Sequence, residues 1–146
     1  MTQKNVQHTQ GTRFQRDNGT GWDDISQCKD IVPADVSRTT IDVTTIDQYD
    51  GSDPDLYKQY VGGLLEAGDC SLELVFDPRS ISNQRIIEGD IDAPNPLRYR
   101  ILYIDGATDT FYAILKSMKR TNPMDDVTRQ SLTLKVSGKP VYEVVA

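Results

Sequence analysis

The side chains best suited to chemistry are carboxylates and aromatic rings that crowd between residues 47 and 60. Asp47, Asp50, Asp53 and Asp55 bring a high density of acid beside a glycine and a proline, which raises the question of a calcium site. Their spacing does not match the EF-hand loop, whose ligands stand at alternate positions and end in a glutamate at the twelfth. We therefore expect these aspartates to be solvated in a flexible loop.

Aromatic residues allow a second function class, a monomeric carbohydrate- or ligand-binding β-module. Trp22, Tyr49, Tyr57 and Tyr60 could stack on a sugar ring or another flat ligand. A third class is a two-carboxylate glycosidase, but any acidic protein offers many carboxylate pairs. The sequence contains no nucleophile elbow, P-loop, dinucleotide fingerprint or zinc spacing. It therefore predicts a chain that is not an enzyme and takes no cofactor.

Histidine and cysteine are too scarce for the usual catalytic and metal sites. His8 is the single histidine, so a zinc site or a Ser-His-Asp triad would need ligands from another subunit. Cys28 and Cys70 are too few and too far apart for a disulfide framework or a CxxC metal site. Each is predicted to be a small buried apolar residue rather than a reactive thiol.

Length and charge favour one acidic, non-catalytic β domain. The 146 residues are enough for one domain with its own core, and the net charge is −6. Such a balance is poor for gripping nucleic acid, because affinity there comes from neutralising phosphates, although it would let nucleic acid slide past. No apolar run approaches the roughly 20 residues of a membrane helix, and the first residues do not resemble a secretory signal. We expect folding in the cytoplasm and no membrane insertion.

Alternating apolar and polar residues predict a small antiparallel β-barrel or sandwich. Inward-facing residues recur every second position in about seven short segments, the clearest being 39–46, 69–77, 97–104, 108–118 and 128–137. In the first of these, Ile41 and Val43 are expected to face the core. Asn18-Gly19 and Asp105-Gly106 predict hairpin turns. Residues 26–36 read as a connection or edge segment, Lys139-Pro140 should end the strand before it, and residues 141–145 form a last strand or an exposed arm.

Two further elements complete the expected architecture. Residues 80–89, within a flanking region at 79–90, are the best helix candidate, because Ile81, Ile86 and Ile87 form an apolar stripe that ends at Gly89. A long inter-strand loop is expected at 45–65, where a hairpin would need only about 2–5 residues. Its second half is apolar and tyrosine-rich, with a possible short helix at 54–60 that Gly62-Gly63 would stop. Extended termini are expected at 1–12, a flexible N-terminal arm, and at 140–146, a C-terminal arm.

The order of these segments resembles the tail tube (major tail) proteins of long, non-contractile-tailed bacteriophages, related to the lambda tail tube protein and to the type VI secretion tube protein. The segments that carry the resemblance are SRTTIDVTTID at 37–47, YVGGLLEAGDCSLELVFDP at 60–78 and TNPMDDVTRQSLTLKVSGKP at 121–140. The likeness covers most of the chain, from about residue 13 to the end. The acidic insert at 50–55 is a departure from the family pattern.

The resemblance implies a single tail-tube domain over 1–146 that assembles as hexameric rings stacked into a hollow tube in the virion. The implied partners are other copies of the chain, a tape-measure protein, tail terminator and baseplate or tip proteins, and DNA passing through the lumen during ejection. A type VI-like secretion tube protein is the related alternative. The loop would then bind neighbouring subunits, and its candidate interface residues are Asp47, Tyr49, Leu56, Tyr57, Tyr60, Val61, Leu64 and Leu65.

Overall fold

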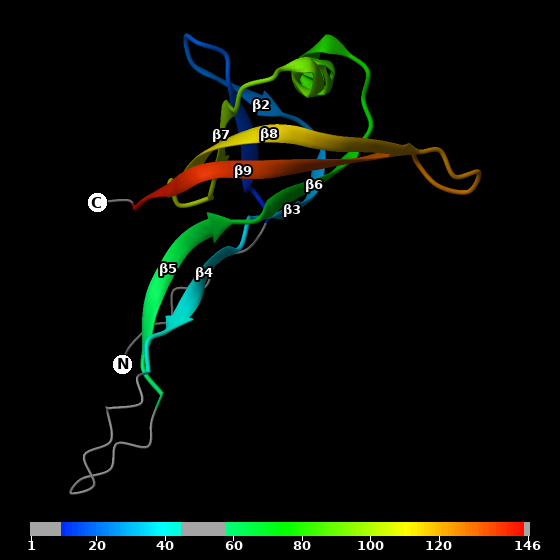
Figure 1. Cartoon of the computed structure of the whole chain (residues 1–146). Coiled ribbons are helices and arrows are strands. Elements are labelled where there is room, and N and C mark those ends of the chain that lie inside the picture. The colour runs from blue at the N-terminus through cyan, green and yellow to red at the C-terminus, as the bar shows by residue number, and fades with distance from the viewer. Residues whose placement is uncertain (1–9, 45–57, 145–146) are drawn as a thin grey trace, which may run out of the picture. The chain divides into compact units, whose positions relative to one another are not determined.

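A computed structural model describes residues 10–44 and 58–144 and divides the chain into two units. The larger unit contains the residues before Val36 and from Ala67 onward, and the smaller one is Val36–Glu66. Among the described residues, the larger unit holds a seven-stranded antiparallel sheet in the order β2-β1-β7-β8-β9-β6-β3 (Figure 1). Its strands are β1 (Arg13–Asp17), β2 (Trp22–Ile25), β3 (Cys28–Val32), β6 (Asp69–Val75), β7 (Leu97–Leu102), β8 (Thr108–Thr121) and β9 (Arg129–Glu143).

The connection between β2 and β3 shows that this sheet folds over on itself. These strands form its two edges, yet only Ser26 and Gln27 separate them in the chain. The link from Ile25 to Cys28 is three Cα–Cα steps and reaches at most about 11 Å, so these ends of the two edge strands must approach each other. No ladder joins β2 to β3 in the part of the chain that the structure describes, so the fold is sandwich-like rather than a closed barrel.

The predicted alternation fills the interior of the folded sheet. Phe14, Tyr99 and Phe111 pack against one another there, with ring centroids 5.7–6.3 Å apart; Phe14 stacks on Tyr99, and Phe111 is tilted against both. Around them lie the inward residues of each strand, including Ile101, Leu72, Leu74, Ala113, Leu115, Leu132, Leu134 and Val136. Both predicted hairpins are confirmed: β1 pairs with β2 across Asn18-Gly19, and β7 pairs with β8 across Asp105-Gly106.

One expected feature of this sheet was wrong, and one open alternative is resolved. Lys139-Pro140 does not end its strand, because Gly138, with φ of +81°, begins a bulge that leaves residues 138–140 facing Phe111. A bulge tolerates the missing N–H of proline, so β9 continues to Glu143 and overlaps the expected arm at 140–146. Residues 28–32 form the edge strand β3, paired with β6, which confirms the edge alternative for residues 26–36.

The flanking helix is a chain of three short turns: η2 (Ser80–Ser82), α1 (Gln84–Glu88) and η3 (Gly89–Asp92). The expected single helix fails because Asn83 takes a left-handed conformation, with φ of +60°, between the first two. Ile87 and Gln84 face inward, whereas Ile81 and Ile86 of the predicted stripe are exposed. Helical pieces this short are stable only when docked.

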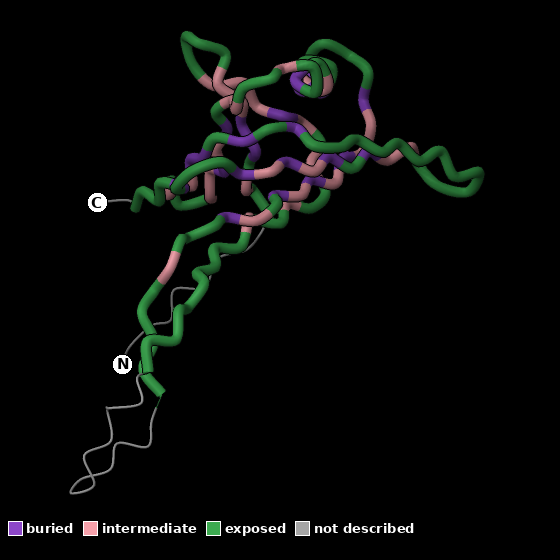
Figure 2. The backbone as a smooth tube through the Cα atoms, viewed as in Figure 1, coloured by how far each residue is buried: buried purple, intermediate pink, exposed green. Residues whose placement is uncertain are grey.

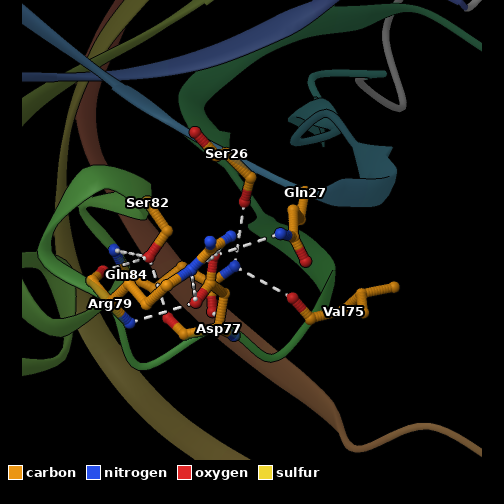
Figure 3. A network of polar contacts seen from close by, with 7 residues as sticks. All are labelled: Ser26, Gln27, Val75, Asp77, Arg79, Ser82 and Gln84. Carbon is orange, nitrogen blue, oxygen red and sulfur yellow. Dashed lines mark hydrogen bonds and ion pairs between the residues drawn. The ribbon is translucent and has the colours of Figure 1, made fainter.

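A buried glutamine docks these turns onto the sheet (Figure 3). Gln84 Nε2 donates to the carbonyls of Ser26 at 2.9 Å and Val75 at 3.0 Å, and Gln84 Oε1 accepts from the Asp77 N–H at 2.9 Å. Asp77 in turn binds the Arg79 side chain, and these hydrogen bonds hold the pKa of Asp77 below its usual value. The amide thus satisfies backbone groups at the ends of β2 and β6 that would otherwise be buried without partners.

Two carboxylates, those of Glu88 and Asp90, bind the end of the helical segment 80–92 to the sheet. Asp90 accepts two hydrogen bonds from Arg16 and one from the Tyr99 hydroxyl, all at 2.7 Å. Glu88 accepts from Gln130 at 2.7 Å and from Arg120 at 2.8 Å. Burial alone would raise the pKa of Glu88, but these donors outweigh it and the pKa is lowered. The turns are therefore held by polar contacts at three points.

Candidate assembly surface

The smaller unit is a two-stranded ribbon of β4 (Val36–Asp42) and β5 (Tyr60–Ala67). Thr39 lies opposite Gly63, and the Val43 N–H donates to the Gln59 carbonyl at 2.9 Å, so the strands run antiparallel. At the end of the described ribbon, Thr44 Oγ1 accepts from the Gln59 N–H at 2.8 Å. The ribbon is therefore a regular hydrogen-bonded hairpin arm up to that point.

Side chains at the same end also order the backbone. The Thr44 N–H donates to Asp42 Oδ1 at 2.9 Å, and this hydrogen bond holds the pKa of Asp42 below its usual value. Within the ribbon, a Cβ at Gly63 would meet the Thr39 carbonyl oxygen at 3.1 Å, and one at Gly62 would meet Arg38 at 2.8 Å. The two glycines thus make room for the side chains of the facing strand rather than stopping a helix.

Most of this ribbon is exposed (Figure 2), and its exposed residues include apolar side chains on both faces. Leu64 is 87% exposed and Leu65 57%, and alternate residues of a strand point to opposite sides. Ile41 on β4 is 53% exposed. An isolated two-stranded hairpin is only marginally stable in water, because it has no packed face. The ribbon therefore carries apolar surface that a partner could cover.

The structure separates the eight predicted interface residues into two groups. Tyr60, Val61, Leu64 and Leu65 lie together on β5, and all are exposed. The other four lie outside the described residues: Asp47, Tyr49, Leu56 and Tyr57. The loop expected at 45–65 is wrong from Tyr60 onward, where β5 begins. Its sequence escaped the strand pattern because both faces of β5 carry apolar residues.

Sequence reasoning placed β4 wrongly and so missed part of this surface. Ile41 and Val43 were expected to face a core, but both are exposed, as is Val36 at the start of the strand. In the described residues β4 pairs with β5 alone and not with the large sheet. Alternation correctly predicted the strand, but it cannot distinguish a face that packs within the chain from one that is free to pack against another molecule.

Trp22, which was considered for ligand stacking, contacts two arginine side chains of its own chain. The guanidinium of Arg100 lies 4.3 Å from the centroid of the Trp22 ring, and that of Arg98 lies 5.0 Å from it. Arg98 also pairs with Asp17. Cation–π contacts of this kind stabilise the outer face of β2, β1 and β7. This arrangement gives no support to a sugar platform at Trp22.

Buried carboxylates of the large unit hold the fold together. Asp77 and Asp90 are both engaged by arginines, as described above, so neither is set up as a free general acid or base. Among residues 10–44 and 58–144, no three His, Cys, Asp or Glu side chains come together to hold a metal ion. The aspartates at 47–55 that raised the question of calcium lie outside the described residues.

Cys70 is a buried thiol and Cys28 a partly buried one. Burial raises the pKa of Cys28 and of Cys70 to about 12, so each is protonated at neutral pH. Cys70 belongs to the apolar core, and Cys28 packs against it. The predicted burial is confirmed for Cys70 and holds in part for Cys28, whereas the low reactivity of both thiols stays a prediction.

Fold and surface together define a class: a curled β-sheet protein with a helical flank and an exposed ribbon suited to binding other subunits. The family model of the lambda phage tail tube protein, TTP, matches residues 6–143. The chain belongs to this family, and it is a structural protein of a virion tail tube. No curated protein matches its sequence. In the described part of the chain, no helix is long and apolar enough to span a membrane.

Solved structures with a similar fold come from tubes and their end pieces. The tail of an empty gene transfer agent particle, refined with C6 symmetry, has a TM-score of 0.72 at 15% identity, covering 95% of this chain and 100% of that one. The SPP1 tail tube has a TM-score of 0.64 at 9% identity, covering 94% and 79%. The cap of the anti-feeding prophage has a TM-score of 0.71 at 11% identity, covering 99% and 95%.

Proposed function

We propose that this chain assembles into hexameric rings, that the rings stack into a hollow tube, and that the β4–β5 ribbon joins one subunit to the next. The observation that supports the proposal is the exposure of apolar residues on both faces of a hydrogen-bonded ribbon. Full burial of one leucine side chain contributes about 1.5–3 kcal/mol. Several such residues on one arm are enough to favour association over the free monomer.

Ring formation also explains why the ribbon can remain exposed in one subunit. A head-to-tail contact buries one surface of a subunit against a different surface of its neighbour and closes when the rotation returns to the first subunit. The gene transfer agent tail was refined with sixfold symmetry, which supports six subunits for this chain. We further propose that Asp47, Tyr49, Leu56 and Tyr57 continue the same contact beyond β5, and that residues 1–12 help join neighbours.

The tube would serve as a conduit rather than an enzyme. Its partners would be a tape-measure protein inside, terminator and baseplate or tip proteins at the ends, and DNA in transit. The net charge of −6 suits this role, because an acidic subunit has weak affinity for phosphates and leaves DNA mobile. We propose no catalytic activity for the chain.

Substitution of one exposed leucine tests the role of the ribbon. Leu64→Ser should leave the thermal unfolding of the large unit unchanged and raise the protein concentration needed for rings or tubes by at least roughly tenfold, as about 1.4 kcal/mol per contact requires. Leu64→Met, which keeps apolar volume, is the matched control and should assemble like the wild type. Negative-stain electron microscopy and sedimentation velocity report both. Normal assembly by Leu64→Ser would refute the assignment.

A further inference from the structure

A head-to-tail ring requires a receiving surface as well as the ribbon. One hollow in the described part of the large unit has a volume of about 110 Å³ and is lined by Pro33, Ala34, Ile101, Phe111, Val136 and Tyr142. We call it the core-mouth pocket, because Ile101, Phe111 and Val136 also belong to the apolar core. All the residues that line this pocket belong to the larger unit.

Volume and polarity suit this pocket to one branched aliphatic side chain. An apolar protein cavity of about 150 Å³ stays dry and holds benzene. A somewhat smaller apolar pocket fits an isobutyl group. Leu64, at 87% exposure, is the leucine that the ribbon presents most fully.

Charge adds a second, independent match. Asp109 also lines the pocket, and its Oδ2 accepts a hydrogen bond from the Tyr103 hydroxyl at 2.7 Å. No basic side chain of the described residues pairs with this carboxylate. On the ribbon, the register that sets Thr39 opposite Gly63 sets Arg38 opposite Leu64 on the same face. No acid in the described part of the chain pairs with Arg38.

We propose that the core-mouth pocket receives Leu64 from the ribbon of a neighbouring copy, and that Arg38 of that ribbon pairs with Asp109 at the pocket. This inference rests on the proposed ring assembly and names the two surfaces that meet in it. The leucine supplies apolar burial, whereas the ion pair fixes the direction and register of the approach. The pocket therefore completes its lining only in the assembly.

Cross-linking between two differently marked chains tests the contact directly. Leu64→Cys and Ala34→Cys are made in separate chains, mixed, allowed to assemble and oxidised. A disulfide-linked dimer on a non-reducing gel is expected from this mixture and not from either variant alone. The matched control replaces the pocket variant by Tyr112→Cys, which is exposed on β8 and points away from the core, and should give no dimer.

Electron microscopy of the same samples distinguishes a failure of the pocket contact from a failure of ring assembly. Rings without the specific dimer, or with equal cross-linking to Tyr112→Cys, would overturn the pocket assignment and leave ring assembly standing. A cross-link from Ala34→Cys to Thr2→Cys in place of Leu64→Cys would assign the pocket to the N-terminal segment and also overturn the proposal. Absence of rings at every concentration and salt would overturn the proposed function and this inference with it.

A charge exchange tests the ion pair separately. Arg38→Asp or Asp109→Arg alone should raise the concentration needed for assembly by roughly 10-fold or more, and the two together should restore it to within about threefold. Tyr103→Phe is the control for the hydrogen bond that Asp109 makes within its own subunit, and it should assemble normally. Additive losses in the double variant would show that the two charges do not meet.

Discussion

Asp90 offers the sharpest test of how the helical segment is held on the sheet. Its carboxylate is 5% exposed and accepts two hydrogen bonds from Arg16 and one from Tyr99. The paired carboxylate strengthens the hydrogen bonding of the guanidinium, and the pKa of Arg16 is raised. Asp90→Asn keeps the shape of the side chain but leaves this largely buried guanidinium without its counter-charge.

Removing one partner of a buried ion pair costs about 3–5 kcal/mol. For a chain of this size, where one kcal/mol lowers the melting temperature by about 2–4 °C, the midpoint should fall by roughly 6–20 °C. Differential scanning calorimetry and urea titration measure the loss. The matched control is Asp92→Asn, an exposed aspartate on the same turn, which should change stability by less than about 0.5 kcal/mol.

A second variant distinguishes the charge from the packing. Replacing both partners, as in Arg16→Met with Asp90→Leu, removes the pair without leaving a buried charge. The double variant should therefore be more stable than Asp90→Asn. A loss below about 1 kcal/mol for Asp90→Asn would refute the claim that this carboxylate anchors η3. A double variant less stable than the single one would refute the charge argument.

Three further predictions concern the hydrogen bonds of Gln84 and Asp77, called here the polar clasp, and the two thiols. Gln84→Glu removes the donor to two buried backbone carbonyls and should destabilise the fold by roughly 2–4 kcal/mol in urea titrations; full stability would contradict the clasp. Hydrogen bonds from Arg79 lower the pKa of Asp77 in the folded protein. The ionised Asp77 carboxylate therefore contributes fully to the free energy of unfolding above about pH 3.8, the ordinary pKa of aspartate. This contribution is lost as the pH falls through the lower pKa of the folded state. The melting temperature of the wild type should therefore fall more steeply at acid pH than that of Asp77→Asn; parallel slopes would contradict it. Cys28 and Cys70 should react with a thiol reagent only at the rate of unfolding, and immediate labelling would contradict their burial.

The large sheet could be predicted from the sequence because its strands have one inner and one outer face. Leu132, Leu134 and Val136 are separated by polar residues, and the structure buries all three. The two hairpin turns carry Asn-Gly and Asp-Gly, whose backbone preferences fix short connections. Local chemistry and tertiary packing agree in these elements, so periodicity was sufficient.

Elsewhere the deciding contacts are distant in the chain. Gln84 lies within the helix predicted at 80–89, but its side-chain amide donates to the backbone carbonyls of Ser26 and Val75, which no local pattern reveals. Asn83, which interrupts the helix, also makes a distant contact: its side-chain amide donates to the Asp24 carbonyl at 2.8 Å. A glycine two residues before a proline could have suggested the bulge at Gly138. The number of residues in the bulge, however, depends on the register with which β9 pairs with β8.

The assembly surface was only half predictable. The concentration of apolar and tyrosine residues drew attention to residues 56–65, and the resemblance assigned them to contacts between subunits, which stays a prediction. The strand β5 was missed because Leu64 and Leu65, which point to opposite faces, are both apolar, and this breaks the alternation of a half-buried strand.

A cryo-electron microscopy reconstruction of the wild-type protein, assembled at high concentration, tests the central claim most directly. We predict hollow rings with sixfold symmetry, in which the β4–β5 ribbon of each subunit lies against its neighbour and both Leu64 and Leu65 are buried. A reconstruction that leaves the ribbon in solvent, or a protein that remains monomeric under all conditions, would contradict the account.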